Sequence, residues 1–337
     1  MAEFRRDPVV GRWVIVNTDD SQGPESFEKE DHVMKQEAIC QFCSGRENQT
    51  PPEIEAVRPM GTSPNSPGWS VRVVANKFPA LRIEGDLNRR GIGIFDMSNG
   101  IGAHEVLIET PVHTKSLADF SNVEVLEVIR KYKSRSLSLA GDRRFKYILI
   151  FKNHGESAGA SLEHGHSQII ALPMVPKHVL EELEGGKQYF GYRGRCIFCD
   201  MIEQEYKEKD RIVTENKDFL VMCPFASRYP FENWIIPKKH MANFTDISVD
   251  QEYSLACILK EALFRLKTCL SNPAYNFFLH TAPIHYPNHE SYHWHIEIVP
   301  ILTRVAGFEW GTGFHIVPTA PKNAATYLKG ISFNFTI

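Results

Sequence analysis

The segment His164-Gly165-His166-Ser167-Gln168 has the strongest chemical potential in the chain. A neutral imidazole is a good nucleophile toward phosphorus, because its ordinary pKa is about 6.5. Such a histidine can take a nucleotidyl group as a phosphoramidate and pass it to a second phosphate. In a strand, Gln168 points to the same face as His166, so its amide can donate to a phosphate oxygen. We therefore predict His166 and Gln168 as catalytic residues; the alternative is an incidental histidine-rich loop.

A loop of small residues precedes this segment. Residues 153–161 read Asn-His-Gly-Glu-Ser-Ala-Gly-Ala-Ser. Backbone N–H groups of such a loop, together with Ser and Asn side chains, are suited to binding phosphate. We expect Asn153, Gly159 and Ser161 to contact the substrate.

Two Cys-x-x-Cys pairs are each followed by two distant histidines, which is the ligand set of tetrahedral zinc. The two sets are Cys40, Cys43, His113 and His164, and then Cys196, Cys199, His240 and His293. We expect at least one zinc ion per chain and, from the repeat, two. Four protein ligands leave no open position for substrate, so both sites are predicted to be structural. A metal on His164 would also fix the loop that presents His166.

A further cluster is possible in the second half of the chain. His295 and Glu297 stand where the first half has His166 and Gln168. A carboxylate at that position would repel a phosphate, so we predict that the second copy has lost catalysis. Glu182, His280, His295 and Glu297 could hold another metal or form an internal histidine network, and the sequence leaves both open.

The elements that must position these residues occur twice. Each half contains a Cys-x-x-Cys, a strand that ends in Pro and His, a helix, a strand, and a histidine cluster that leads into an apolar strand. Both helices are predicted to start at a capping box, Ser121-x-x-Glu124 and Ser248-x-x-Gln251. The fold class is therefore α+β, with duplicated units of mostly antiparallel sheet and packed helices. We place the catalytic unit at 1–185 and the degenerate unit at 186–337, with a helix ending at Gly185-Gly186 between them.

The composition narrows the class of protein. The chain has 337 residues, a net charge of −3 and 42% hydrophobic residues, values typical of a globular protein. The acidic balance argues against a nucleic-acid binder, we expect no signal peptide, and the sequence contains no apolar run of membrane-spanning length. Cys-x-x-Cys pairs with an odd total of seven cysteines favour reduced, metal-binding thiols. We expect a cytoplasmic protein without nucleic-acid or membrane partners.

The duplicated unit with His-x-His-x-Gln resembles the histidine-triad superfamily, and specifically the galactose-1-phosphate uridylyltransferase family, across essentially the whole chain. Further shared marks are Asp7-Pro-x-x-Gly-Arg-Trp-Val, Asn76-Lys-Phe-Pro-Ala-Leu, Pro111-Val-His, and Asn153 with Ser161. The resemblance implies ping-pong nucleotidyl transfer through His166, with zinc on the first ligand set. It also implies that Asn76 contacts the nucleotide. A homodimer is implied in which the C-terminal region of one subunit helps to form the site of the other.

Several positions depart from the family pattern. Gly165 replaces the usual proline between the histidines, and Lys77 replaces an aspartate. Residues 17–24 replace an Arg-rich segment, and residues 307–313 replace the hexose-recognition segment, in which we expect Phe308 and Gly311 to contact the sugar. These features resemble the plant-type ADP-glucose phosphorylase branch.

Three functions therefore remain open. The first is UDP-glucose–hexose-1-phosphate uridylyltransferase, an enzyme of galactose metabolism that uses galactose 1-phosphate as acceptor. The second is an ADP-glucose phosphorylase with inorganic phosphate as acceptor. The third is a zinc-stapled nucleotide-binding module without turnover.

Overall fold

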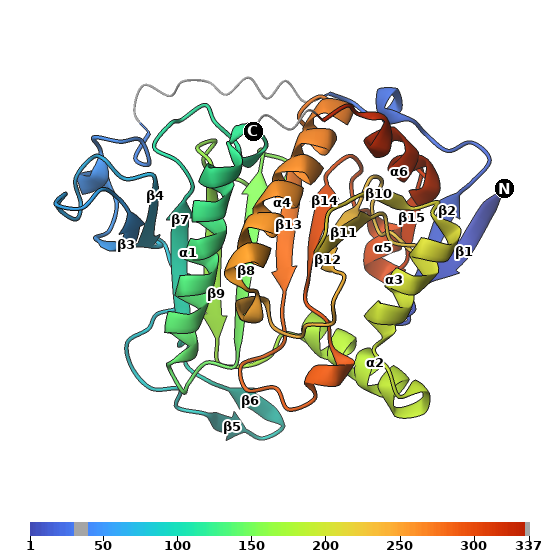
Figure 1. Ribbon diagram of the computed structural model, residues 1–337. Coiled ribbons are helices and arrows are strands. Elements are labelled where there is room, and N and C mark those ends of the chain that lie inside the picture. Colours follow the sequence, from blue (N-terminus) through green and yellow to red (C-terminus); the bar gives the residue numbers. More distant parts are fainter. Residues whose placement is uncertain (30–39, 334–337) are drawn as a thin grey trace.

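A ten-stranded, wholly antiparallel sheet forms the centre of the computed structural model, which describes residues 1–29 and 40–333 (Figure 1). Its strand order is β10-β11-β12-β14-β13-β8-β9-β7-β4-β3. The strands from the first half of the chain are β3 (Glu53–Val57), β4 (Val71–Ala75), β7 (Ala103–Ile108), β8 (Tyr147–His154) and β9 (His166–Leu172). Those from the second half are β10 (Ile212–Glu215), β11 (Phe219–Met222), β12 (Asn233–Pro237), β13 (Tyr275–His280) and β14 (His295–Pro300).

The two halves of the sheet have the same topology. Numbered in chain order, each set of five strands lies in the order 1-2-3-5-4, and the two sets join edge to edge where β8 pairs with β13. A long helix connects the third and fourth strands in both halves, α1 (Asn122–Ala140) and α4 (Val249–Cys269). The prediction of an α+β fold built from duplicated antiparallel units is confirmed, and the structure adds that both units share one continuous sheet.

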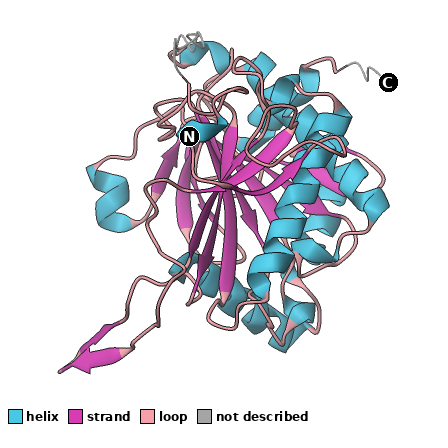
Figure 2. Cartoon of the chain, turned by 90° about the vertical axis from the view of Figure 1, so that its left-hand side faces the viewer, coloured by secondary structure: helices cyan, strands magenta, loops and turns pink. Residues whose placement is uncertain are grey.

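Both long helices form because their ends and faces are defined in the sequence. Each starts at the predicted capping box, in which the Ser side chain accepts a backbone N–H and the third helical residue reaches back. Their apolar stripes are buried against one face of the sheet, where α1 and α4 lie side by side (Figures 1 and 2). The other face is covered beside the second half by α2 (Lys177–Arg193) and α3 (Ile197–Glu208). Strand residues alternate between these two cores, as Val221 and Leu220 do.

The expectation that a helix ends at Gly185-Gly186 is wrong. Helix α2 continues through both glycines to Arg193 and ends at Gly194, which has φ 68°. The glycines serve close packing instead: a Cβ on Gly185 would lie 1.8 Å from the carbonyl oxygen of Val9. The absence of a side chain therefore lets the N-terminal segment cross the helix.

The remaining elements lie around the sheet. A small sheet combines both ends of the chain, β1 (Ala2–Arg6), β2 (Trp13–Asn17) and β15 (His315–Val317). A two-stranded hairpin, β5 (Arg90–Ile92) and β6 (Phe95–Met97), projects from the body (Figure 2). Two shorter helices are α5 (Gly307–Thr312) and α6 (Pro321–Gly330), and the 3-10 turns are Pro24–Ser26, Glu47–Gln49, Leu117–Asp119, Phe244–Asp246 and His289–Ser291. In the described part of the chain, no helix is long and apolar enough to cross a membrane.

Candidate active site

His166 opens strand β9 and faces a cavity on the side of the sheet away from α1. Its Nδ1 lies 2.8 Å from the carbonyl oxygen of His164. A carbonyl only accepts hydrogen bonds, so Nδ1 carries the proton and Nε2 keeps its lone pair. Burial, and secondarily the charge of Lys152, lowers the pKa of His166. The imidazole is therefore held neutral with a free nitrogen, which is the form that a nucleophile requires.

The cavity in front of His166 has a volume of about 390 Å³. It brings together His166 with the predicted residues Gln168, Asn76 and Ser161. Its other lining residues come from five segments of the chain: Gln41 and Phe42; Thr50 and Pro51; Val74, Ala75, Lys77 and Phe78; Val106; and Leu162. A nucleophile, a carboxamide and small polar groups thus surround one space.

Gln168 is oriented by His104, a residue that the sequence analysis did not single out. His104 Nδ1 accepts from the backbone N–H of Ala80 at 3.2 Å, so its proton lies on Nε2. This Nε2 donates to Gln168 Oε1 at 2.7 Å, and Asn76 Nδ2 lies 3.0 Å from the same nitrogen. With its oxygen engaged, Gln168 is left with its amide NH₂ to donate. His104 was recognisable only as a strand residue, since nothing in the sequence joins it to Gln168.

Asn153 shapes the small-residue loop. Its Nδ2 donates to the carbonyl of Gly159 at 3.3 Å, and its Oδ1 accepts from Asn276 of β13 at 2.8 Å. Asn276 also donates to the carbonyl of Ala158 at 2.8 Å. Gly159 has φ 85°, a left-handed conformation that favours glycine. The loop that ends at Ser161 is therefore held by the second half of the chain.

Four predicted substrate residues do not line this cavity: Asn153 and Gly159 of the small-residue loop, and Phe308 and Gly311. Phe308 and Gly311 are on α5 and are not among the residues that line the cavity of His166. Phe308 is 43% exposed and its neighbour Trp310 is 80% exposed. Within one chain, this segment does not meet the nucleophile.

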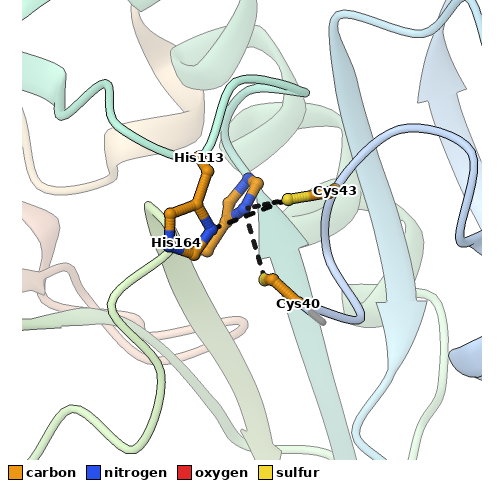
Figure 3. A group of neighbouring side chains, drawn as sticks. All are labelled: Cys40, Cys43, His113 and His164. Carbon is orange, nitrogen blue, oxygen red and sulfur yellow. Dashed lines mark hydrogen bonds between the residues drawn. The ribbon is translucent and has the colours of Figure 1, made fainter. Parts of the chain in front are cut away.

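The four side chains of the first predicted ligand set converge (Figure 3), and the last of them, His164, is two residues before His166. Cys43 Sγ lies 3.6 Å from His113 Nδ1 and 3.7 Å from His164 Nδ1, and Cys40 Sγ lies 3.6 Å from His164 Nδ1. Bonds of about 2.0–2.3 Å place tetrahedral zinc ligands about 3.3–3.8 Å apart, so the spacing fits. His164 Nε2 donates to the carbonyl of Thr110 at 2.7 Å, which leaves Nδ1 for a metal. Burial lowers the pKa of His164 to about 4, so the ring is neutral as a ligand must be.

The second ligand set has the same geometry. Cys199 Sγ lies 3.5 Å from His240 Nδ1 and 3.7 Å from His293 Nδ1. His240 Nε2 donates to the carbonyl of His289 at 3.0 Å, again leaving Nδ1 free for a metal. The hydrogen bond between the two thiols lowers the pKa of Cys196 and raises that of Cys199, so the pair favours one thiolate. Both sets could therefore hold a tetrahedral ion.

The third cluster, Glu182, His280, His295 and Glu297, also converges, with ligand atoms within 4.8 Å of one another. Three of its four side chains are engaged with other protein groups, whereas the buried His295 Nε2 has no hydrogen-bond partner among the described residues. His280 Nδ1 donates to Glu182 at 2.8 Å, Tyr292 donates to the same carboxylate at 2.8 Å, and Arg228 pairs with Glu297.

The negative charges of the two carboxylates in this cluster are neutralised by neighbouring protein side chains. Burial lowers the pKa of His280, but the carboxylates of Glu182 and Glu297 outweigh it and raise that pKa to about 9. The charged His280 and the guanidinium of Arg228 thus supply the positive charge that a bound metal ion would otherwise supply. This arrangement fits an internal network better than a further metal site.

The sequence matches the models of two domains along most of its length. Residues 2–176 match the "Galactose-1-phosphate uridyl transferase, N-terminal domain", and residues 182–326 match the C-terminal domain of the same description. The chain belongs to the galactose-1-phosphate uridyl transferase family. The resemblance seen in the sequence is confirmed, and the chain is an enzyme, a nucleotidyltransferase.

Within the family, relatives of two activities are similar to this chain. It is 37% identical to an ADP-glucose phosphorylase from Arabidopsis thaliana over 98% of this chain and 93% of that protein. It is 27% identical to a galactose-1-phosphate uridylyltransferase from Thermotoga maritima over 98% of each. A crystal structure of the Arabidopsis thaliana ADP-glucose phosphorylase with bound ADP-glucose is 36% identical and superposes with a TM-score of 0.84, covering 99% of this chain and 100% of that chain.

Proposed function

We propose that this nucleotidyltransferase moves AMP from ADP-glucose to inorganic phosphate through a covalent adenylyl-His166. The geometry of His166 carries the proposal, since its Nδ1 donates to the His164 carbonyl and its Nε2 is left as a nucleophile at the cavity. The choice of adenine nucleotide is supported by the higher identity to the ADP-glucose phosphorylase, 37% against 27%. Transfer of UMP from UDP-glucose to galactose 1-phosphate, which the motifs first suggested, is the alternative.

The proposed reaction uses two side chains, His166 and Gln168. His166 Nε2 attacks the α-phosphorus of ADP-glucose, the bond to the bridging oxygen breaks, and glucose 1-phosphate leaves with the electron pair. The Gln168 amide donates to a non-bridging oxygen as negative charge develops there. In the second step an oxygen of inorganic phosphate attacks the same phosphorus, the P–N bond breaks, and ADP leaves while His166 regains its lone pair.

We also propose that Zn²⁺ occupies both four-ligand sets and stabilises the fold. Two thiols and two imidazoles at tetrahedral spacing are the ligands that Zn²⁺ prefers. In the first set the ion would fix His164, whose carbonyl accepts the proton of His166 Nδ1. Residues 1–185 would form the catalytic unit, and residues 186–337 a copy in which Glu297 has replaced the donor amide.

The active enzyme is proposed to be a homodimer whose α5 segment completes the site of the partner. The exposed Phe308 and Trp310, which lie outside the cavity of their own chain, support this arrangement. Complementation tests it: His166→Ala and Gly311→Trp are each expected to be inactive, and mixing the two after reversible dissociation should restore part of the activity. A mixture that stays inactive would contradict the shared site.

Trapping of the intermediate tests the proposed reaction. The protein is incubated without acceptor with ADP-glucose or UDP-glucose labelled at the α-phosphorus, and acid-labile, base-stable label on the protein is counted. Label from ADP-glucose supports the proposal, and label from UDP-glucose alone supports the alternative. Label from neither would contradict the covalent intermediate with these two nucleotide sugars. His166→Ala should take no label, and label retained in that variant would contradict the assignment of the nucleophile.

A further inference from the structure

A buried ion pair lies directly behind the nucleophile, on the opposite face of the sheet from the cavity. Lys152 Nζ donates to Glu109 Oε2 at 2.8 Å, and the two side chains are 1% and 0% exposed. Lys152 is on β8 and Glu109 directly follows β7, the two strands that flank β9. A charge pair so far from water is costly to desolvate, and replacing such pairs by apolar residues often does not reduce stability. Its presence here therefore points to a role beyond stability.

The pair contacts three consecutive residues of the catalytic segment. Lys152 Nζ donates to the carbonyl of His166 at 3.0 Å. The backbone N–H of Glu109 donates to the carbonyl of Gly165 at 3.1 Å. Ser167 Oγ donates to the other oxygen of the Glu109 carboxylate. The backbone on both sides of the nucleophile is thus tied to one ion pair.

Helix α1 extends this network. Tyr132 OH lies 2.5 Å from Ser167 Oγ, and Tyr132 is 2% exposed within the core between α1 and the sheet. The pleat of β9 sends Ser167 to this core and sends His166 and Gln168 to the cavity. The network is therefore separated from the substrate by the sheet itself.

Gly165 gives a second, independent indication. A Cβ at this position would lie 3.2 Å from Glu109 Oε2 and 3.2 Å from the carbonyl oxygen of Lys115, closer than most side chains tolerate. Gly165 and the Lys152–Glu109 ion pair thus fit each other. The Glu109 carboxylate occupies the space that a side chain at position 165 would need.

We propose that Lys152 and Glu109 are positioning residues, which hold the backbone of residues 165–167 so that His166 Nε2 lies in line with the phosphorus. This inference rests on the proposed nucleophilic role of His166. Neither side chain touches substrate, because both lie on the helix-covered face of the sheet. Their removal should reduce the rate of the chemical step more than binding, since a shift of about 1 Å in a reacting group can cost a hundredfold in rate.

A double substitution tests this role without leaving a lone buried charge. Lys152→Met with Glu109→Gln removes both charges and keeps side chains of similar length, so the variant should fold. We expect kcat to fall about tenfold to a hundredfold while KM for the nucleotide sugar stays within about threefold. Zinc content and the far-UV circular dichroism should remain those of the wild type.

A matched control removes another buried pair next to the same strand region. Arg135 on α1 binds Glu105 of β7 through two hydrogen bonds of 2.8 and 2.7 Å, and it does not contact residues 165–167. Arg135→Met with Glu105→Gln should keep kcat within about twofold of the wild type. An equal loss of kcat in both double variants would overturn the inference, because it would indicate general loosening of β7. Wild-type kcat in the Lys152/Glu109 variant would overturn it as well.

Hydrogen exchange separates this inference from the proposed function. In the Lys152/Glu109 variant, amides of a peptide covering residues 164–172 should exchange at least about tenfold faster than in the wild type and in the control. If the wild type takes no label from either nucleotide sugar, the proposed function fails, and unchanged exchange in the variant would overturn the positioning role separately. Rescue is the last criterion: Lys152→Arg, which keeps the charge, should retain more of kcat than Lys152→Met.

Discussion

His104 Nε2 lies 2.7 Å from Gln168 Oε1, and this contact determines which end of the Gln168 amide faces the cavity. Because the backbone N–H of Ala80 donates a hydrogen bond to His104 Nδ1, this nitrogen carries no proton and the histidine can donate only through Nε2. The carboxamide is therefore fixed with its NH₂ available to a phosphate oxygen. Without His104, the amide could turn its oxygen toward the negatively charged substrate.

Substitution of His104 by Phe should reduce the chemical step. We expect kcat to fall about tenfold to a hundredfold, because an unoriented Gln168 donates poorly in the transition state. A double-mutant cycle with Gln168→Ala checks the cause: in the Gln168→Ala background, His104→Phe should cost less than about threefold. Independent, multiplicative losses would show that His104 acts by another route.

The ligand sets and the nucleophile could be predicted because the chain repeats itself. Two Cys-x-x-Cys pairs with matched histidines limit the chemistry to few choices, and both sets do converge. The alternation of a strand places His166 and Gln168 on one face, as the cavity shows. Periodicity and capping boxes likewise defined α1 and α4.

The contacts behind and beside the nucleophile could not be predicted in the same way. Gln168 and His104 are 64 positions apart, and they meet only because β7 pairs with β9 in one particular register. Lys152 reads as an ordinary charged residue at the end of a strand, and its burial depends on the partner Glu109. Neither the register of paired strands nor the burial of an individual side chain can be read from a single sequence.

Substitution of Gly185 by Ala should change the stability of the protein in the direction opposite to that expected from helix propensity. Alanine normally stabilises a helix relative to glycine by about 0.5–1 kcal/mol. At position 185 a Cβ would clash with the carbonyl of Val9, so Gly185→Ala should destabilise the protein by about 2 kcal/mol or more. Gly191 lies in the same helix with nothing within 4 Å of a Cβ, so Gly191→Ala should be stabilising. Urea denaturation measures both, and equal effects would contradict the packing explanation.

Arg228 should be needed for stability rather than for catalysis. Its guanidinium pairs with the buried carboxylates of Glu232 and Glu297. Arg228→Met would remove the guanidinium from both carboxylates, of which Glu232 keeps hydrogen bonds from Tyr229 N–H and Trp234, at a cost of about 3–5 kcal/mol in the free energy of unfolding. Adding Glu297→Gln should recover part of this loss. No recovery would mean that Arg228 does not neutralise Glu297, and bound metal in the wild type at this cluster would contradict the internal network.

The two proposed zinc sites should differ in their effect on catalysis. Cys40→Ser and Cys196→Ser are each expected to remove about one of two zinc ions per chain, measured by atomic absorption, and to lower the melting temperature. Only the first site contains His164, whose carbonyl accepts from His166 Nδ1. Loss of that ion should therefore abolish labelling of His166, whereas Cys196→Ser should keep the protein labelled at temperatures where it is folded.

Chelation provides the same comparison in the unaltered protein. Cys43 and Cys199 are both partly buried, so the two sets differ at one ligand: His113 of the first set is buried, whereas its counterpart His240 in the second set is not. EDTA should therefore release zinc in two phases, the second set first, because ligand exchange needs access from solvent. Activity should decline with the slower phase. A decline with the faster phase would place the catalytic dependence on the second set and contradict the role given to His164.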